Sequence, residues 1–296
     1  MGLRGSIHTP FLCFAVLVAI ARPVAALEPE QVLEKSSAGA LALQTPEPAH
    51  LTAAPASASP PVDKPDRAAW MRELRRLAGN EAFLNGVNPY PPGTAAYVGQ
   101  NRFLTALFSN ERFIERFATS ISSQNGTVED QEAFSRKLVM QWIVGGLRRL
   151  DDSDKESLLS VYRKVLDYGS TEQCATMIRG DPLDLVSVQL IAKMDAFDVE
   201  AYYLAIKHAL FAEIEERPEP TLTQEQEQLA KQALAGWANR LDPTEAQRLR
   251  AAFSNLRDAP DSELCWSGKK VIDGILNLQG EPRDWLIRLY FKPQGR

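Results

Sequence analysis

Beyond residue 65, apolar side chains recur every three to four residues along almost the whole chain, which is the spacing of one face of an α-helix. No run of alternating β-branched residues bounded by turn residues interrupts this pattern, so strands are not expected. The pattern predicts helices over residues 68–78, within the aromatic stretch 103–117 and in a long segment that ends near Leu150. The sequence therefore predicts an all-α protein.

Two kinds of cap mark the expected helix starts. A serine or threonine three residues before a glutamate or glutamine has the spacing of a capping box, in which the two residues bond each other's backbone N–H groups. A capping residue directly before a proline also suits a helix start, because the first turn leaves its N–H groups unbonded and proline has none. The boxes are Ser153 with Glu156 and Thr223 with Gln226, and the proline pairs are Asp181-Pro182 and Asp242-Pro243.

Residues 1–26 have the three parts of a secretory signal peptide. Arg4 provides the basic start, residues 11–20 form an apolar run, and Val24-Ala25-Ala26 provides small residues for cleavage. We therefore expect an exported protein that lies in the periplasm or outside the cell. The apolar run is shorter than the roughly 20 residues that span a bilayer, so we expect no stable membrane insertion.

Residues 27–65 are rich in Ala, Pro and Ser and have no apolar periodicity. Such a segment cannot offset the conformational entropy of ordering by burying side chains, which predicts a disordered linker. The linker either tethers the helical body to a partner or is a plain leader. The order of signal, spacer and helical body is similar to the layout of exported folding helpers such as lipase foldases. This likeness is one of layout, and no residue role follows from it.

Residues 150–174 match residues 241–265 at a constant offset, mostly at capping and apolar positions, and the match aligns Cys174 with Cys265. An internal duplication would explain the match and predicts two related multi-helix units, while chance alignment is the alternative. On this interpretation the folded part has an N-terminal helical extension and two repeat units. Their boundaries are 66–127 for the extension, 128–218 for unit 1 and 219–296 for unit 2.

Cys174 and Cys265 are the only cysteines after the signal segment. Two cysteines in an exported chain are most simply read as one disulfide, which here would clamp the two units together. A pair of free thiols is the alternative. The chain has no C-x-x-C motif, which argues against a redox role.

The sequence contains little that points to catalysis. His208 is the only histidine beyond residue 65, and no cysteine is spare, so the usual zinc sites cannot form and we expect no metal or cofactor. Glu156-Ser157 resembles the Glu-Ser pair of lytic transglycosylases, exported helical enzymes with one catalytic glutamate. Ser267 and Lys270 form an S-x-x-K motif, in which a lysine can activate a serine one turn away.

Two features are candidates for binding a partner. Tyr90, Pro91 and Pro92 lie in a proline-rich loop that either presents an aromatic ring for recognition or is a rigid connector. Phe103 and Phe108 belong to an aromatic stretch that lines either a groove for a partner peptide or the core.

The net charge of −5 argues against the concentrated basic face that nucleic-acid binding needs. We therefore expect a non-catalytic exported module that binds another exported protein, as an accessory chaperone, an inhibitor or immunity protein, or an assembly factor. One alternative is a cell-wall-acting enzyme that uses Glu156 or Ser267. The other is a structural envelope protein.

Overall fold

The structure is a computed structural model that describes residues 66–124, 128–179, 184–254 and 258–292. In these ranges the chain forms 13 helices and no strand, which confirms the all-α prediction. The expected signal peptide, the expected linker and the Asp181-Pro182 cap lie outside the described residues. Among the helices of the described ranges, none combines the length and the apolar character needed to cross a membrane.

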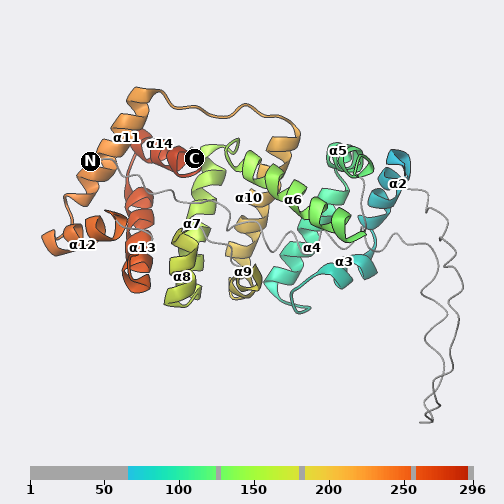
Figure 1. The fold of residues 1–296 in the computed structure, drawn as a ribbon, viewed down its shortest axis with the longest axis horizontal. Coiled ribbons are helices and arrows are strands. Elements are labelled where there is room, and N and C mark those ends of the chain that lie inside the picture. Colours follow the sequence, from blue (N-terminus) through green and yellow to red (C-terminus); the bar gives the residue numbers. More distant parts are fainter. Residues whose placement is uncertain (1–65, 125–127, 180–183, 255–257, 293–296) are drawn as a thin grey trace, which may run out of the picture.

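The helices are labelled in Figure 1. In chain order they are α2 (Arg67–Leu77), α3 (Glu81–Val87), α4 (Ala95–Phe108), α5 (Glu111–Ser122), α6 (Val128–Leu147), α7 (Asp152–Tyr168), α8 (Thr171–Arg179), α9 (Asp184–Ala192), α10 (Ala196–Ile214), α11 (Gln224–Ala238), α12 (Pro243–Ser254), α13 (Asp261–Asn277) and α14 (Glu281–Tyr290).

The molecule is elongated, with α2 to α5 at one end, α11 to α14 at the other, and α7 and α10 between them (Figure 1). Helix α10 packs against α4, α6 and α7, so it joins the N-terminal helices to the rest. Its sequence is apolar on nearly every face, as expected for a helix that neighbours cover on several sides. At the closest approach of α6 to α10, a Cβ added to Gly146 would lie 1.7 Å from the backbone oxygen of Ala209.

The aromatic stretch predicted to form either a groove or the core lies mainly in the core. Phe113 stacks on Phe117 with ring centroids 5.2 Å apart, and both rings contact the edge or face of Trp142 in α6. Phe108 is fully buried and packs edge-on against Phe113. These contacts bury large aromatic surfaces where α4, α5 and α6 meet, and such burial is the main driving force for packing.

The helix caps agree with the sequence prediction at two of the three described positions. Thr223 and Gln226 form the expected capping box, and α12 begins at Pro243 with Asp242 accepting from the Thr244 N–H at 2.8 Å. The Ser153–Glu156 box was a wrong prediction, because Asp151 caps α7 by accepting the Asp154 N–H at 2.8 Å. A carboxylate at this position also interacts favourably with the positive end of the helix dipole.

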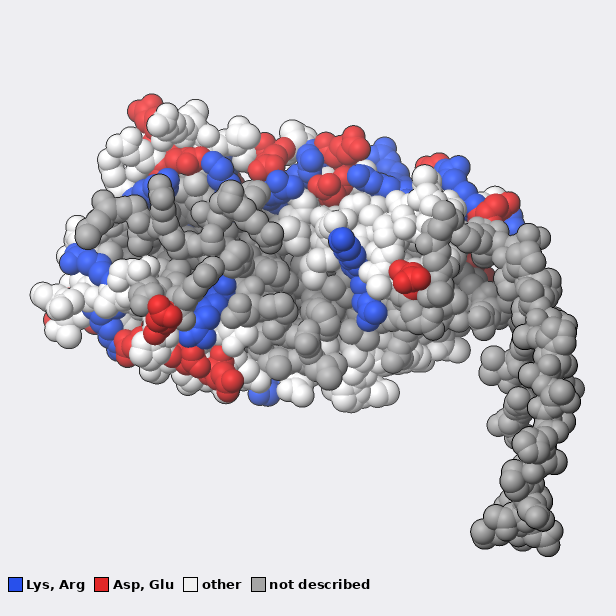
Figure 2. All heavy atoms as spheres, in the orientation of Figure 1, with Lys and Arg blue, Asp and Glu red and all other residues white. Residues whose placement is uncertain are grey.

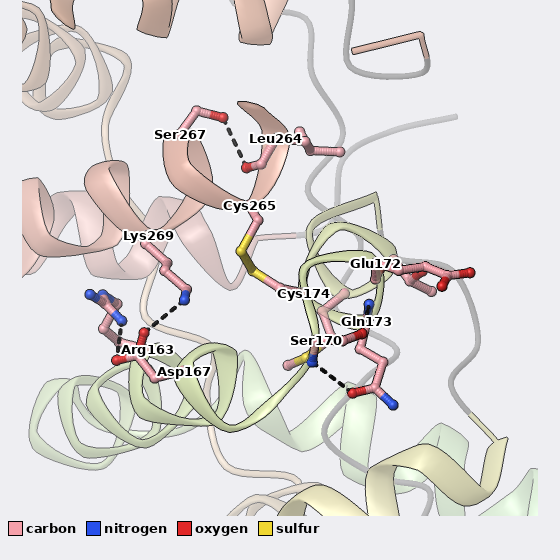
Figure 3. Close-up of a disulfide and its surroundings, with 12 residues drawn as sticks. Arg163, Asp167, Ser170, Glu172, Gln173, Cys174, Leu264, Cys265, Ser267 and Lys269 are labelled. Carbon is pink, nitrogen blue, oxygen red and sulfur yellow. Dashed lines mark hydrogen bonds and ion pairs between the residues drawn. A yellow bond between two sulfur atoms is a disulfide. The ribbon is translucent and has the colours of Figure 1, made fainter. Parts of the chain in front are cut away.

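The predicted disulfide joins Cys174 in α8 to Cys265 in α13 across a sequence separation of 91 residues (Figure 3). Helices α8 and α13 pack closely beside the bond, because Gly268 has no side chain where an added Cβ would lie 2.3 Å from Ile178. In the same view Lys269 of α13 reaches Asp167 of α7 at 2.7 Å.

The internal duplication is not confirmed. The matched segments form helices of unequal length, since α7 has 17 residues and α12 has 12. Cys174 lies in the nine-residue α8, whereas Cys265 lies in the 17-residue α13. The domain boundaries at residues 127 and 218 stay predictions.

Candidate functional site

A groove of about 490 Å³ lies between α4 and the N-terminal half of α10. Its lining residues recur every three to four positions along each helix, so each helix contributes one continuous face. The lining of α4 and the turn before it comprises Gly93, Thr94, Ala95, Val98, Gly99, Arg102, Phe103 and Ala106, and that of α10 comprises Ala196, Val199, Glu200, Tyr203, Leu204 and Lys207.

A small residue lets α4 and α10 approach each other closely beside the groove. A Cβ added to Gly99 would lie 2.6 Å from Val199 Cγ1 and 2.7 Å from Tyr203 Cδ2, so any other residue would require these side chains of α10 to move. Ala95 and Ala196 are also small, whereas Val98 and Leu204 carry larger side chains. The lining of the groove therefore mixes small and large apolar residues from the two helices.

The groove also gathers much of the exposed apolar surface of the described residues. Val98 is 42% exposed and Leu204 is 41% exposed, and both line the groove. Phe197 is 76% exposed and directly follows the lining residue Ala196. Among the described residues, Leu229 in α11 is the other large apolar side chain with comparable exposure, at 42%. Exposed apolar groups gathered beside a concave surface are typical of an interaction site.

Two cations accompany this apolar surface. Within the described ranges, Arg102 and Lys207 have neither a hydrogen bond nor an ion pair, although many other basic side chains do. Glu200 is the one carboxylate that lines the groove. The lining of the groove therefore combines an apolar surface with a net positive charge. Elsewhere basic and acidic side chains are interspersed, as along the upper edge of the face in Figure 2.

The residues predicted to bind a partner do not lie on one surface of the structure. Tyr90 is buried, its ring does not face solvent, and its hydroxyl accepts from the Tyr203 hydroxyl at 3.4 Å. Burial raises the pKa of Tyr90 above its ordinary value. Pro91 and Pro92 are exposed and Phe108 is buried in the core. Phe103 lines the floor of the groove, although little of its ring is exposed.

The residues that give the groove its character are not among those predicted from the sequence, namely Val98, Arg102, Leu204 and Lys207. Val98 and Arg102 are one turn apart in α4, and Leu204 and Lys207 are one turn apart in α10, so an apolar residue beside a cation recurs on both helices. That repeated pairing was the available signal. It has meaning only once α4 and α10 are known to pack together.

The residues considered for catalysis have structural partners. Glu156 accepts a hydrogen bond from Arg283 at 3.0 Å. Ser267 is buried and donates to the Leu264 carbonyl oxygen at 2.9 Å (Figure 3). Lys270 pairs with Glu245, so the S-x-x-K side chains do not pair with each other. His208 Nδ1 lies 2.7 Å from Asp154 Oδ2, which links α10 to α7.

Among the described residues, no group of three or more His, Cys, Asp or Glu side chains is placed to hold a metal ion. Comparison of the chain with known protein families, with curated proteins and with solved structures finds no match.

Proposed function

We propose that this protein is an exported, non-catalytic helical module that binds an apolar, acidic segment of another exported protein in the α4–α10 groove. One observation carries the proposal: exposed Val98 and Leu204 lie in the same groove as Arg102 and Lys207. In the described ranges these two cations have neither a hydrogen bond nor an ion pair. Export itself rests on the signal-like residues 1–26.

The two kinds of residue would contribute differently to binding. Covering the exposed part of Val98 or Leu204 with a partner's apolar atoms would stabilise a complex by about 1 kcal/mol each. Carboxylates of the partner near Arg102 and Lys207 would add mainly specificity and faster association, because charges attract over a longer range than apolar groups. The volume of the groove lies within the range of roughly 300–1,000 Å³ that is usual for ligand sites.

An amphipathic helix is the form of partner segment that suits the groove best. Two packed helices leave a furrow whose walls are ridges of side chains, and a third helix can lay its own ridge into such a furrow. Partner helices of this kind contact their groove through residues three or four positions apart. The segment would place apolar residues against Val98 and Leu204, with Asp or Glu beside Arg102 and Lys207.

The proposal is tested by binding to the full-length protein. The protein is immobilised, the protein that it retains from the exported fraction of its own cells is identified and purified, and the dissociation constant is measured. We expect Leu204→Glu and Arg102→Glu each to weaken binding at least about tenfold, which corresponds to roughly 1.4 kcal/mol.

Leu229→Glu is the matched control, because it places the same charge at an equally exposed apolar position on α11. It should bind as the wild type does. Equal weakening by Leu204→Glu and Leu229→Glu, with both variants folded by circular dichroism, would remove the groove from the proposal.

The other two functions have less support. Glu156 is paired with Arg283 and Ser267 is buried, so neither side chain is free in the way that a catalytic group for cell-wall chemistry should be. A structural role predicts tight self-association without a foreign partner. Sedimentation of the purified protein distinguishes that role, since a stable oligomer that Leu204→Glu dissociates would mean that the groove binds a second copy.

A further inference from the structure

A second, smaller cavity of about 150 Å³ lies where the C-terminal end of α6, the start of α7, the segment before α11 and the end of α14 come together. Four of its lining residues are cationic and one is acidic. The cations are Arg148, Lys155, Arg288 and Lys292, the acid is Glu219, and the other lining residues are Pro220, Thr221, Leu222 and Phe291.

Lys155 is the most unusual of these residues, because its side chain is only 1% exposed. Its ammonium group donates one hydrogen bond in the described structure, to the Arg148 carbonyl oxygen at 3.1 Å, although it has three N–H donors. Burial lowers the pKa of Lys155, and the nearby Asp152 carboxylate opposes this effect. A buried ammonium with unused donors is costly unless a negative group comes close.

Arg148 has an unused donor at the same cavity. Its Nε atom is buried, and no group of the described residues accepts a hydrogen bond from it. Its Nη1 atom lies 3.8 Å from Glu219 Oε2, which is too far for a hydrogen bond. The buried ammonium of Lys155 and the partly exposed guanidinium of Arg148 therefore line one small space, and each has an N–H donor without an acceptor in the described residues.

The other charged groups around the cavity do not accept hydrogen bonds from the unused donors of Lys155 and Arg148. Arg288 donates two hydrogen bonds to Asp152, at 2.8 and 2.6 Å, so each largely neutralises the other. Lys292 donates one hydrogen bond to Glu227. Of the lining residues, Glu219 is the one carboxylate left to balance Arg148 and Lys155, and the Asp151 carboxylate outside the lining also attracts Lys155. The lining itself therefore keeps one positive charge in excess.

We propose that this cavity binds a tetrahedral oxyanion, phosphate or sulfate, through the free donors of Lys155 and Arg148. The ion is either free or the end group of a larger molecule. The cavity is comparable in size to about five water molecules, which suits an ion of five heavy atoms. Hydrogen bonds between cationic N–H groups and phosphate oxygens are among the stronger ones in proteins. The site is separate from the α4–α10 groove and does not depend on its function.

Thermal unfolding of the full-length protein tests this site, with sodium phosphate compared against sodium chloride at equal ionic strength. At about ten times the dissociation constant, a bound ion should raise the Tm by about 3–6 °C, because it binds only the folded state. Sulfate should act in the same way. Glycerol 3-phosphate distinguishes the sources: a shift at least as large as that of phosphate indicates a phosphomonoester end group, and a smaller shift indicates the free ion.

Lys155→Met and Arg148→Met should each lose the phosphate-dependent rise while remaining folded, since methionine replaces the long side chain without a charge. Lys270→Met is the control, because it removes the charge of a lysine that lies outside the cavity and pairs with Glu245, and it should keep the rise. Isothermal titration of the unaltered protein with phosphate gives a result that needs no variant. The proposal is overturned if phosphate and chloride give the same Tm, or if both methionine variants keep the full rise.

Discussion

Asp152 shows at the scale of one residue how the fold depends on pH. The hydrogen bonds from Arg288 lower the pKa of the Asp152 carboxyl below its ordinary value, and the charge of Arg288 adds to this effect. Because the pKa is lower in the folded state than in the unfolded state, the pair stabilises the fold above the unfolded pKa of about 4. That contribution is lost as the pH falls through the folded-state pKa.

We predict that Asp152→Asn lowers the free energy of unfolding by about 1 kcal/mol at pH 7, because the pair is only partly exposed and bidentate. Urea denaturation at pH 7 and at pH 3 should show the difference from wild type shrinking at the lower pH. A difference that stays constant over this range would mean that the carboxylate's charge does not contribute.

The burial of single residues is what the sequence predicts least well. Lys155 stands in a polar, acidic stretch that is typical of a solvated helix start, yet residues 219–222 and the end of α14 enclose it. Tyr90 stands between prolines in a loop, yet its ring turns inward to Tyr203. Both contacts join residues far apart in the chain, and such contacts leave no local pattern.

At the scale of helices, the packing of α6 against α10 depends on Gly146. A Cβ at this position would overlap the Ala209 carbonyl of α10, and a backbone atom cannot move aside as a flexible side chain can. We predict that Gly146→Ala lowers the free energy of unfolding by about 3 kcal/mol, at the upper end of the usual cost of overpacking.

Gly86→Ala is the matched control within α3, since a Cβ there meets nothing within 4 Å. This change should raise stability by up to about 1 kcal/mol, because alanine favours a helix more than glycine does. Denaturation of both variants checks the pair of predictions. Similar stability for the two would show that α6 and α10 are not packed as described.

Helices are predictable here where one face is apolar and the caps are unambiguous, as at Thr223. One helix cap and one helix face cannot be predicted in this way. The true cap of α7, Asp151, lies only two residues before Ser153, and several acidic and hydroxyl residues compete for the role. In α10 nearly every face is apolar, so periodicity cannot tell that Leu204 and Lys207 lie in a groove.

At the scale of the whole molecule, the disulfide holds α13 to α8 in the part of the fold away from the groove. In Figure 1, α7 and α10 lie between α13 and α4. The bond closes a loop of 91 residues, and restricting such a loop in the unfolded chain stabilises the fold by about 4–5 kcal/mol in the chain-entropy description.

We predict that replacing Cys174 and Cys265 together by alanine lowers the free energy of unfolding by about that amount. Guanidinium denaturation with and without reductant measures it. Reductant should destabilise the wild type and leave the double variant unchanged. A wild type that is equally stable in reductant would contradict the prediction.

The disulfide could be predicted because the chain has only two cysteines after the expected signal peptide. The all-α fold could be predicted because strand patterns are absent from the sequence. The matched segments around the cysteines suggested a duplication that unequal helices do not confirm, because similar caps and apolar positions recur in many helices. The groove and the cationic cavity both arise where helices distant in sequence meet. Neither could be located before the packing of α4 on α10, or of α14 on α7, was known.

The proposed function depends on the α4–α10 groove being the surface that binds a partner protein. The most direct measurement places a photo-crosslinking benzophenone side chain at position 204 of the full-length protein, and at position 229 in a control. After illumination in the exported fraction of the native cells, the adducts are identified by mass spectrometry. We expect position 204 to yield one main adduct, at a helical segment with apolar and acidic residues, and position 229 to yield none of it. The same adducts from both positions, or none from position 204 while the protein still retains its partner, would contradict the claim.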